Sequence, residues 1–139
     1  MTSIDPTRES LENLKQSVPM DKPVTMLNLL RFNEQAAYPS DSAHAPCSGR
    51  EAYKRYSETA FAKLGEVGAR PVWMGKALAS VIAPGDEHWD EVFLIRYPSG
   101  QAFLQMIGMP DYQAATIHRT AALADSRLIA TVEAGSKDQ

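Results

Sequence analysis

The 139-residue sequence has one cysteine, no surplus of basic residues and no long hydrophobic run. The lone Cys47 cannot form an internal disulfide, which excludes a disulfide scaffold and fits a reducing compartment. With 14 Lys and Arg against 17 Asp and Glu, the net charge is −3, which argues against nucleic acid as a partner because phosphate binding needs a basic surface. No stretch approaches the roughly 18 apolar residues of a membrane span, and the first residues lack the pattern of a secretory signal. We therefore expect a cytoplasmic protein with no membrane partner.

Helix and strand signals follow one another along most of the chain. Residues 1–22 predict a short helical lead-in that begins at Asp5 and Pro6, because aspartate caps free N–H groups and proline suits the first helical turn. The signals in residues 23–135 indicate one further domain. Its expected elements are a strand at 23–32, a long loop at 33–47, a helix capped by Ser48, strands at 70–84 and 89–98, a helix in two pieces after Ser99, and a strand at 126–132.

This order, β-α-β-β-α-β, is that of a ferredoxin-like α+β fold, in which helices cover one face of an antiparallel sheet. The predicted strands, however, are apolar on both sides. Something else must bury the second face, and the simplest partner is another copy of the chain. We expect a homodimer that forms through the sheet faces.

Four segments resemble the domain-of-unknown-function 1330 (DUF1330) family of the dimeric α/β-barrel superfamily: PVTMLNLLRF, GREAYKRY, WDEVFLIRYPS and PDYQAATIHRTAALADSRLI. The resemblance implies that two ferredoxin-like subunits pack sheet to sheet into a barrel, each with a cavity between sheet and helices. Relatives in this superfamily include cofactor-free monooxygenases, lactone isomerases and haem proteins, so the resemblance implies no particular reaction. The positions that match the family's pattern are Tyr53, Tyr56, Gly68, Arg70, Gly75, Ser99, Pro110, Tyr112 and Arg119.

A histidine and an arginine stand together near the end of the last predicted helix. His118, with an ordinary pKa near ~6.5, suits a general acid or base, and Arg119 suits the binding of a carboxylate or enolate oxygen. His118 shares a helical stripe with Ala114 and Ala121, so its ring is expected to point toward the sheet. The alternative is structural: His118 is bonded to backbone groups, and Arg119 is paired with Asp125.

Amide and aromatic side chains add candidate binding residues. Asn28 interrupts an apolar strand, so its amide either binds a ligand or ties the strand to a helix. Tyr53 and Tyr56 on the first domain helix, and Trp73 on the second strand, supply aromatic walls with polar tips, or they are core residues.

The loop residues His44 and Cys47 supply fewer ligands than a zinc site needs, and we expect neither a metal nor a cofactor. The prediction is a protein that binds a small, partly apolar metabolite. As an enzyme it would be a cofactor-free isomerase or monooxygenase, with His118 as acid or base and with Arg119 and Asn28 steadying an oxyanion. The alternative is a non-catalytic binding or interaction protein. The predicted pocket residues are Asn28, Tyr53, Tyr56, Trp73, His118 and Arg119.

Overall fold

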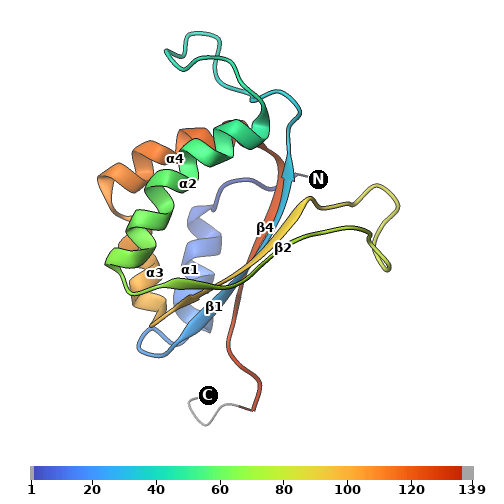
Figure 1. The fold of residues 1–139 in the computed structure, drawn as a ribbon. Helices are drawn as coiled ribbons and strands as arrows, with labels where there is room; N and C mark the ends of the chain where they lie inside the picture. The colour runs from blue at the N-terminus through green and yellow to red at the C-terminus, as the bar shows by residue number, and fades with distance from the viewer. Residues whose placement is uncertain (1, 136–139) are drawn as a thin grey trace.

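The computed structural model describes residues 2–135 of the chain. A four-stranded sheet forms one layer, and the helices lie together on one side of it (Figure 1). No helix among the described residues is long and apolar enough to cross a membrane. The elements in chain order are α1 (Arg8–Ser17), β1 (Val24–Phe32), α2 (Gly49–Glu66), β2 (Arg70–Lys76), β3 (Glu91–Tyr97), α3 (Gly100–Ile107), α4 (Pro110–Ala122) and β4 (Leu123–Thr131).

The strands are arranged in the order β2-β3-β1-β4, and every neighbouring pair is antiparallel. This arrangement confirms the ferredoxin-like α+β fold that the order of elements predicts. Strands β2 and β4 form the two edges, so the sheet is open and does not close into a barrel within one chain.

The alternation of side chains gives the sheet two different faces. The face toward the helices carries Met26, Phe93 and Ile95, which are buried in the core. The opposite face carries an apolar row that crosses all four strands, because the register places neighbouring residues side by side. Trp73 pairs with Leu94, Leu94 with Leu27, and Leu27 with Ile129. Within residues 2–135, no helix covers this row (Figure 1).

Capping explains where the core helices begin. The Ser48 hydroxyl accepts a hydrogen bond from the Glu51 backbone N–H at 3.1 Å, and the Ser99 hydroxyl accepts one from Ala102 at 3.0 Å. Both starts agree with the sequence. The start expected at Asp5 is wrong, because Thr7 caps α1 and forms a reciprocal pair of hydrogen bonds with Ser10.

Two strand boundaries also differ from the prediction. The second strand does not extend to residue 84 but ends at Lys76. Its apolar continuation forms a loop that projects beyond the sheet (Figure 1), where Leu78, Val81 and Ile82 are 92–96% exposed. An alternating apolar pattern makes a strand only where a partner strand meets it, and the single chain offers none there. The last strand begins earlier, at Leu123, directly after α4.

Candidate functional site

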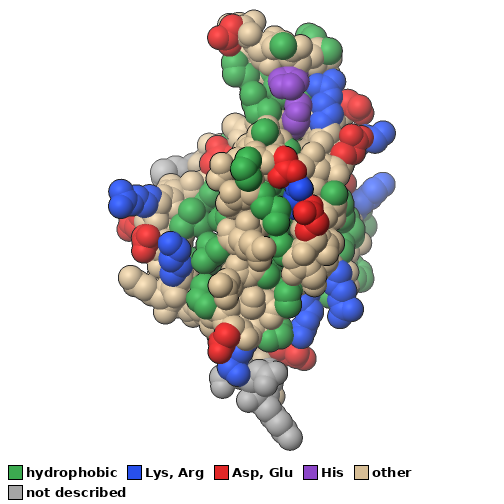
Figure 2. Space-filling model, turned by 90° about the vertical axis from the view of Figure 1, so that its left-hand side faces the viewer, with side chains coloured by type: hydrophobic (Ala, Val, Ile, Leu, Met, Phe, Trp, Pro, Cys, Tyr) green, Lys and Arg blue, Asp and Glu red, His purple; other side chains and the backbone are tan. Residues whose placement is uncertain are grey.

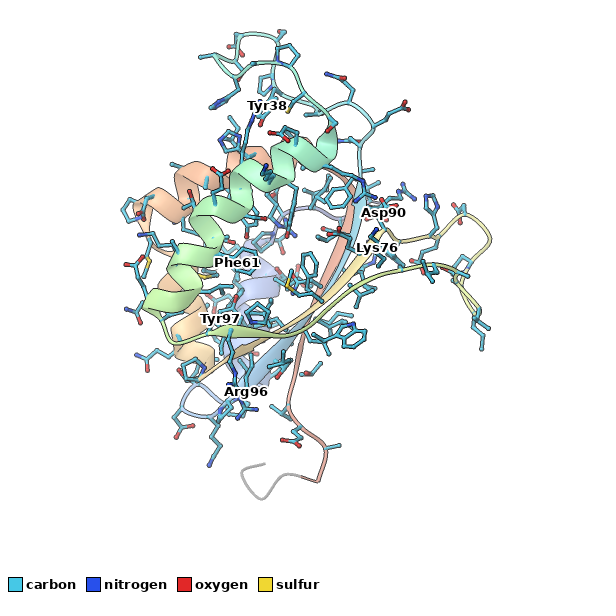
Figure 3. The ribbon with its side chains drawn as sticks, viewed as in Figure 1. Tyr38, Phe61, Lys76, Asp90, Arg96 and Tyr97 are labelled. Atoms are coloured by element: carbon cyan, nitrogen blue, oxygen red, sulfur yellow. The ribbon has the colours of Figure 1, made fainter. Side chains whose placement is uncertain are left out.

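A cavity of about 720 Å³ lies between the helix-covered face of the sheet, the helices and the N-terminal segment. Its volume falls within the range of small-molecule pockets, about 300–1,000 Å³. Figure 3 shows Tyr97 on β3 pointing into the space between sheet and helices. The apolar walls are formed mainly by Met26, Phe93, Ile95, Tyr97, Phe103 and Met106.

Three of the four tyrosines that line this cavity come from the helices. Tyr53 and Tyr56 come from α2, and Tyr112 comes from α4. The hydroxyls of Tyr56 and Tyr112 are hydrogen-bonded at 2.7 Å. Among the described residues, the Tyr53 hydroxyl has no hydrogen-bond partner, although its ring packs against Phe32 and Tyr56. The Tyr53 hydroxyl is therefore available to a ligand.

Burial sets the protonation state of these phenols. It raises the pKa of Tyr53 far above the ordinary value of 10, and it raises the pKa of Tyr56 in the same way. Arg119 lines the same cavity, and its positive charge lowers both pKa values against the larger effect of burial. Both phenols keep their protons at neutral pH and serve as hydrogen-bond donors.

Arg119 lines the cavity because of its position on α4. The face that α4 turns inward carries Tyr112, Ala115, Arg119 and Ala122, spaced as i, i+3, i+7 and i+10. A guanidinium N–H of Arg119 donates a hydrogen bond to the backbone carbonyl of Ile4. The expected structural pairing of Arg119 with Asp125 is wrong: Asp125 binds Arg127 at 2.6 Å instead.

Asn28 lies at the centre of the sheet, on the face toward the cavity. Its amide nitrogen donates to the backbone carbonyl of Met26 at 3.3 Å, a contact within its own strand. It makes no hydrogen bond to a helix among the described residues, so the expectation of a tie between strand and helix is wrong. Its amide oxygen is left without a protein partner in that part of the chain, at the surface of the cavity.

The N-terminal segment closes one side of the cavity. Ser3 runs along the edge of β4: its N–H donates to Asp125 Oδ1 at 2.9 Å, and its carbonyl accepts from the Ser126 hydroxyl at 2.6 Å. Ile4 and, from α1, Leu11 and Leu14 then line the cavity. The lead-in is thus part of the wall of the site, which its weak sequence signal did not predict.

His118 does not line the cavity, so the expectation that its ring points toward the sheet is wrong. Its Nδ1 lies 2.6 Å from the Tyr38 hydroxyl, and its ring lies 4.5 Å from that of His44, both in the loop after β1. Figure 2 shows histidine side chains side by side, next to a basic group, on the helix-covered side. The stripe through Ala114 and Ala121 does not mark the inward face of α4, since Ala114 is exposed.

The Tyr38 hydroxyl links Arg55 to His118. Arg55 donates a hydrogen bond to the Tyr38 hydroxyl oxygen at 3.1 Å, and the same hydroxyl forms a second hydrogen bond with His118 Nδ1. Burial, and then the nearby charges of His44 and Arg55, lower the pKa of His118 below 6.5.

Trp73 is also absent from the cavity. Its register on β2 places it opposite Leu94 on the uncovered face of the sheet, where the side chain is 59% exposed. Of the six predicted pocket residues, Asn28, Tyr53, Tyr56 and Arg119 line one cavity, whereas Trp73 and His118 lie elsewhere. Tyr112 was not among the six, although its spacing of seven residues from Arg119 on one helix was a usable signal.

Comparison with known proteins places the fold in context. A protein of unknown function from Rhodopseudomonas palustris is 40% identical, covers 94% of this chain and 96% of its own, and has a TM-score of 0.85. A dabb-family protein with a ferredoxin-like fold from Mesorhizobium loti is 14% identical, with coverages of 81% and 98% and a TM-score of 0.51. A cofactor-independent oxygenase from Streptomyces nogalater is 14% identical, with coverages of 85% and 99% and a TM-score of 0.50. The last two show the fold alone.

No curated protein matches the sequence. The profile of the family described as "Domain of unknown function (DUF1330)" matches residues 43–132, which include α2, α3, α4 and three of the four strands. The cavity residues Tyr53, Tyr56, Tyr112 and Arg119 all fall inside this match. The chain therefore belongs to the DUF1330 family.

Proposed function

We propose that this protein binds a small, partly apolar metabolite in the cavity between sheet and helices. The observation that carries the proposal is the composition of the walls of this cavity. Aromatic and aliphatic side chains form most of the surface, and a few polar groups converge on it from Asn28, Tyr53 and Arg119. An apolar pocket with a small number of placed polar groups is the usual form of a small-molecule site.

The groups that line the cavity support binding more directly than catalysis. Its charged lining residues, among those described, are Asp5, Arg119 and Arg127, and no histidine, cysteine or glutamate lines it. The phenols are poor bases at neutral pH because burial raises the pKa of each. The cofactor-independent oxygenase of the same fold motivates a test for cofactor-free isomerase or oxygenase turnover. Such turnover would rely on a reactive substrate and on the oxyanion-stabilising groups Arg119 and Asn28.

The second part of the proposal is that the protein works as a homodimer whose uncovered sheet faces pack together. The apolar row of Trp73, Leu94, Leu27 and Ile129 crosses the whole sheet on that face. Burying such a row against a second copy removes it from water, and a two-fold axis lets one patch serve both subunits.

A ligand screen with two matched variants tests the binding proposal. A metabolite library is screened by thermal shift, since a ligand at ~100 times its Kd adds ~2.7 kcal/mol of stability. Ser57→Trp places a large ring at a lining position on α2, whereas Ala62→Trp adds the same ring at an exposed position of that helix which does not line the cavity. The shift should disappear with Ser57→Trp and persist with Ala62→Trp. Equal shifts in both variants would place the binding site elsewhere.

A further inference from the structure

The cavity contains one positive charge that no carboxylate neutralises. Arg127 binds Asp125 at 2.6 Å and Glu87 at 3.6 Å, so its charge is compensated. Arg119 is partly buried, and among residues 2–135 no carboxylate comes within the 4.0 Å of an ion pair. Asp5 also lines the cavity, where its carboxylate accepts a hydrogen bond from the Thr120 hydroxyl at 2.9 Å and, among the described residues, forms no ion pair with Arg119.

An uncompensated guanidinium in an apolar site favours an anionic occupant. A charge removed from water is stabilised only by an opposite charge and by hydrogen bonds. The carbonyl of Ile4 supplies one acceptor to Arg119 but no formal charge. Since a guanidinium has five N–H donors, most of its donor capacity is not used by that contact.

Neutral hydroxyl donors lie beside this cation. The Tyr53 hydroxyl lines the cavity without a hydrogen-bond partner among the described residues. In the Tyr56–Tyr112 pair, one hydroxyl donates to the other, and the acceptor of that bond still has its own proton to donate. A planar arginine fork and phenolic donors together match a delocalised oxyanion.

We propose that the ligand is a monoanion with a planar oxyanion head, a carboxylate or an enolate, bound by Arg119 and Tyr53, and an apolar body. This inference rests on the binding function proposed above and specifies its ligand class. The body lies against Met26, Ile95 and Phe103. One uncompensated cation balances one negative charge, which disfavours the dianionic phosphate esters that clusters of basic residues bind.

Three aromatic probes of similar size separate the two kinds of head group from a neutral one. They are 1-naphthoate, its neutral isostere 1-naphthamide, and the enolate of 1-phenyl-1,3-butanedione, each titrated into the full-length protein by calorimetry. A charge-assisted contact should make naphthoate, the enolate or both bind about tenfold or more tightly than naphthamide. The anion with the greater advantage identifies the head group as carboxylate or enolate.

Variants show whether Arg119 is the group responsible. Arg119→Met should reduce the affinity of the favoured anion about tenfold or more and leave naphthamide within about twofold. Tyr53→Phe should reduce it several-fold by removing one neutral donor. The control Arg8→Met removes the same charge from an exposed α1 residue that does not line the cavity, and it should leave all affinities unchanged. The folding of each variant is checked by circular dichroism, and the wild-type comparison holds even if Arg119→Met fails to fold.

The outcomes separate this inference from the function on which it rests. If all three probes bind the wild type equally, the oxyanion site is wrong, but the apolar cavity remains a binding site. The inference also fails if Arg119→Met folds and binds the favoured anion as the wild type does. If none of the probes binds, the inference fails, and the binding function is then decided by the metabolite screen with Ser57→Trp and Ala62→Trp.

Discussion

The hydrogen bond between the Tyr56 and Tyr112 hydroxyls joins α2 to α4 at the wall of the cavity. Both side chains are buried, and their rings meet nearly edge to face at 5.9 Å. This single contact between residues therefore contributes both to the packing of the two helices and to the polarity of the site.

Removal of either hydroxyl should destabilise the fold. We expect Tyr56→Phe and Tyr112→Phe each to cost about 1–2 kcal/mol, because each leaves a buried hydroxyl without its partner. The double variant should cost less than the sum, since no orphaned group remains. Urea unfolding of all four proteins measures this coupling, and strictly additive losses would show that the hydrogen bond contributes nothing.

Helix α2 shows how one glycine position differs from another within a single element. Gly49, at its start, lies where the loop after β1 and the end of α4 meet. A Cβ placed there would lie 2.1 Å from the Asn33 carbonyl oxygen and 2.7 Å from that of Ala122. Gly65, near its end, has no atom within 4 Å of such a Cβ.

The same substitution at these two positions should have opposite effects. Gly49→Ala forces backbone atoms apart and should destabilise the protein by about 1–3 kcal/mol or more. Gly65→Ala reduces the freedom of the unfolded chain without a clash and should stabilise it by about 0.4–1 kcal/mol. Denaturant midpoints measure both, and a stable Gly49→Ala protein would contradict the close approach at the start of α2.

The loop after β1 is attached to α4 through the ring of His118, and this attachment depends on pH. Protonation of His118 adds a positive charge beside Arg55 and His44. Because the pKa of His118 is lower in the folded state than its ordinary 6.5, the unfolded chain binds the proton more readily. The stability that His118 contributes is therefore complete above pH 6.5 and is lost as the pH falls from 6.5 through the folded pKa.

A non-titrating variant isolates this effect. His118→Asn keeps a hydrogen-bonding amide group near the position of Nδ1 and does not ionise. Between pH 7.5 and pH 5, approximately, the wild type should lose more stability than this variant. Thermal unfolding at both pH values gives the comparison. An equal loss of stability in the two proteins would show that His118 does not cause the pH dependence. Ligand affinity at constant pH should change little, since His118 does not line the cavity.

At the scale of the whole molecule, the uncovered face of the sheet is the surface through which we propose that two copies pack. If two copies pack through this face, light scattering at micromolar concentration should give twice the chain mass of 15.3 kDa. Leu27→Glu places a charge at the centre of the apolar row, where burial against a partner would be costly, and should give the single-chain mass. The control Ala62→Glu adds the same charge at an exposed position of α2, on the helix-covered side of the sheet, and should not change the mass. A wild-type mass of 15.3 kDa would exclude the dimer.

The order of elements, the caps of α2 and α3 and the alternation along the strands follow from local rules. The proline and serine signals around α2, α3 and α4 act on nearby backbone groups, and strand alternation is a property of consecutive residues. These features were therefore predictable from the sequence. The predicted strand to residue 84 failed because strand formation also needs a partner, which the sequence pattern alone does not supply.

The sequence by itself determined the ferredoxin-like fold, the family and the candidates Asn28, Tyr53, Tyr56 and Arg119. Only the tertiary structure decided which candidates share a cavity. His118 and Arg119 are neighbours in sequence, yet a rotation of about 100° per residue turns one toward the loop and the other toward the cavity. The choice of the inward face depends on how α4 packs against α2 and the sheet. The same packing brings the N-terminal segment to Arg119 through a contact between residues 115 positions apart.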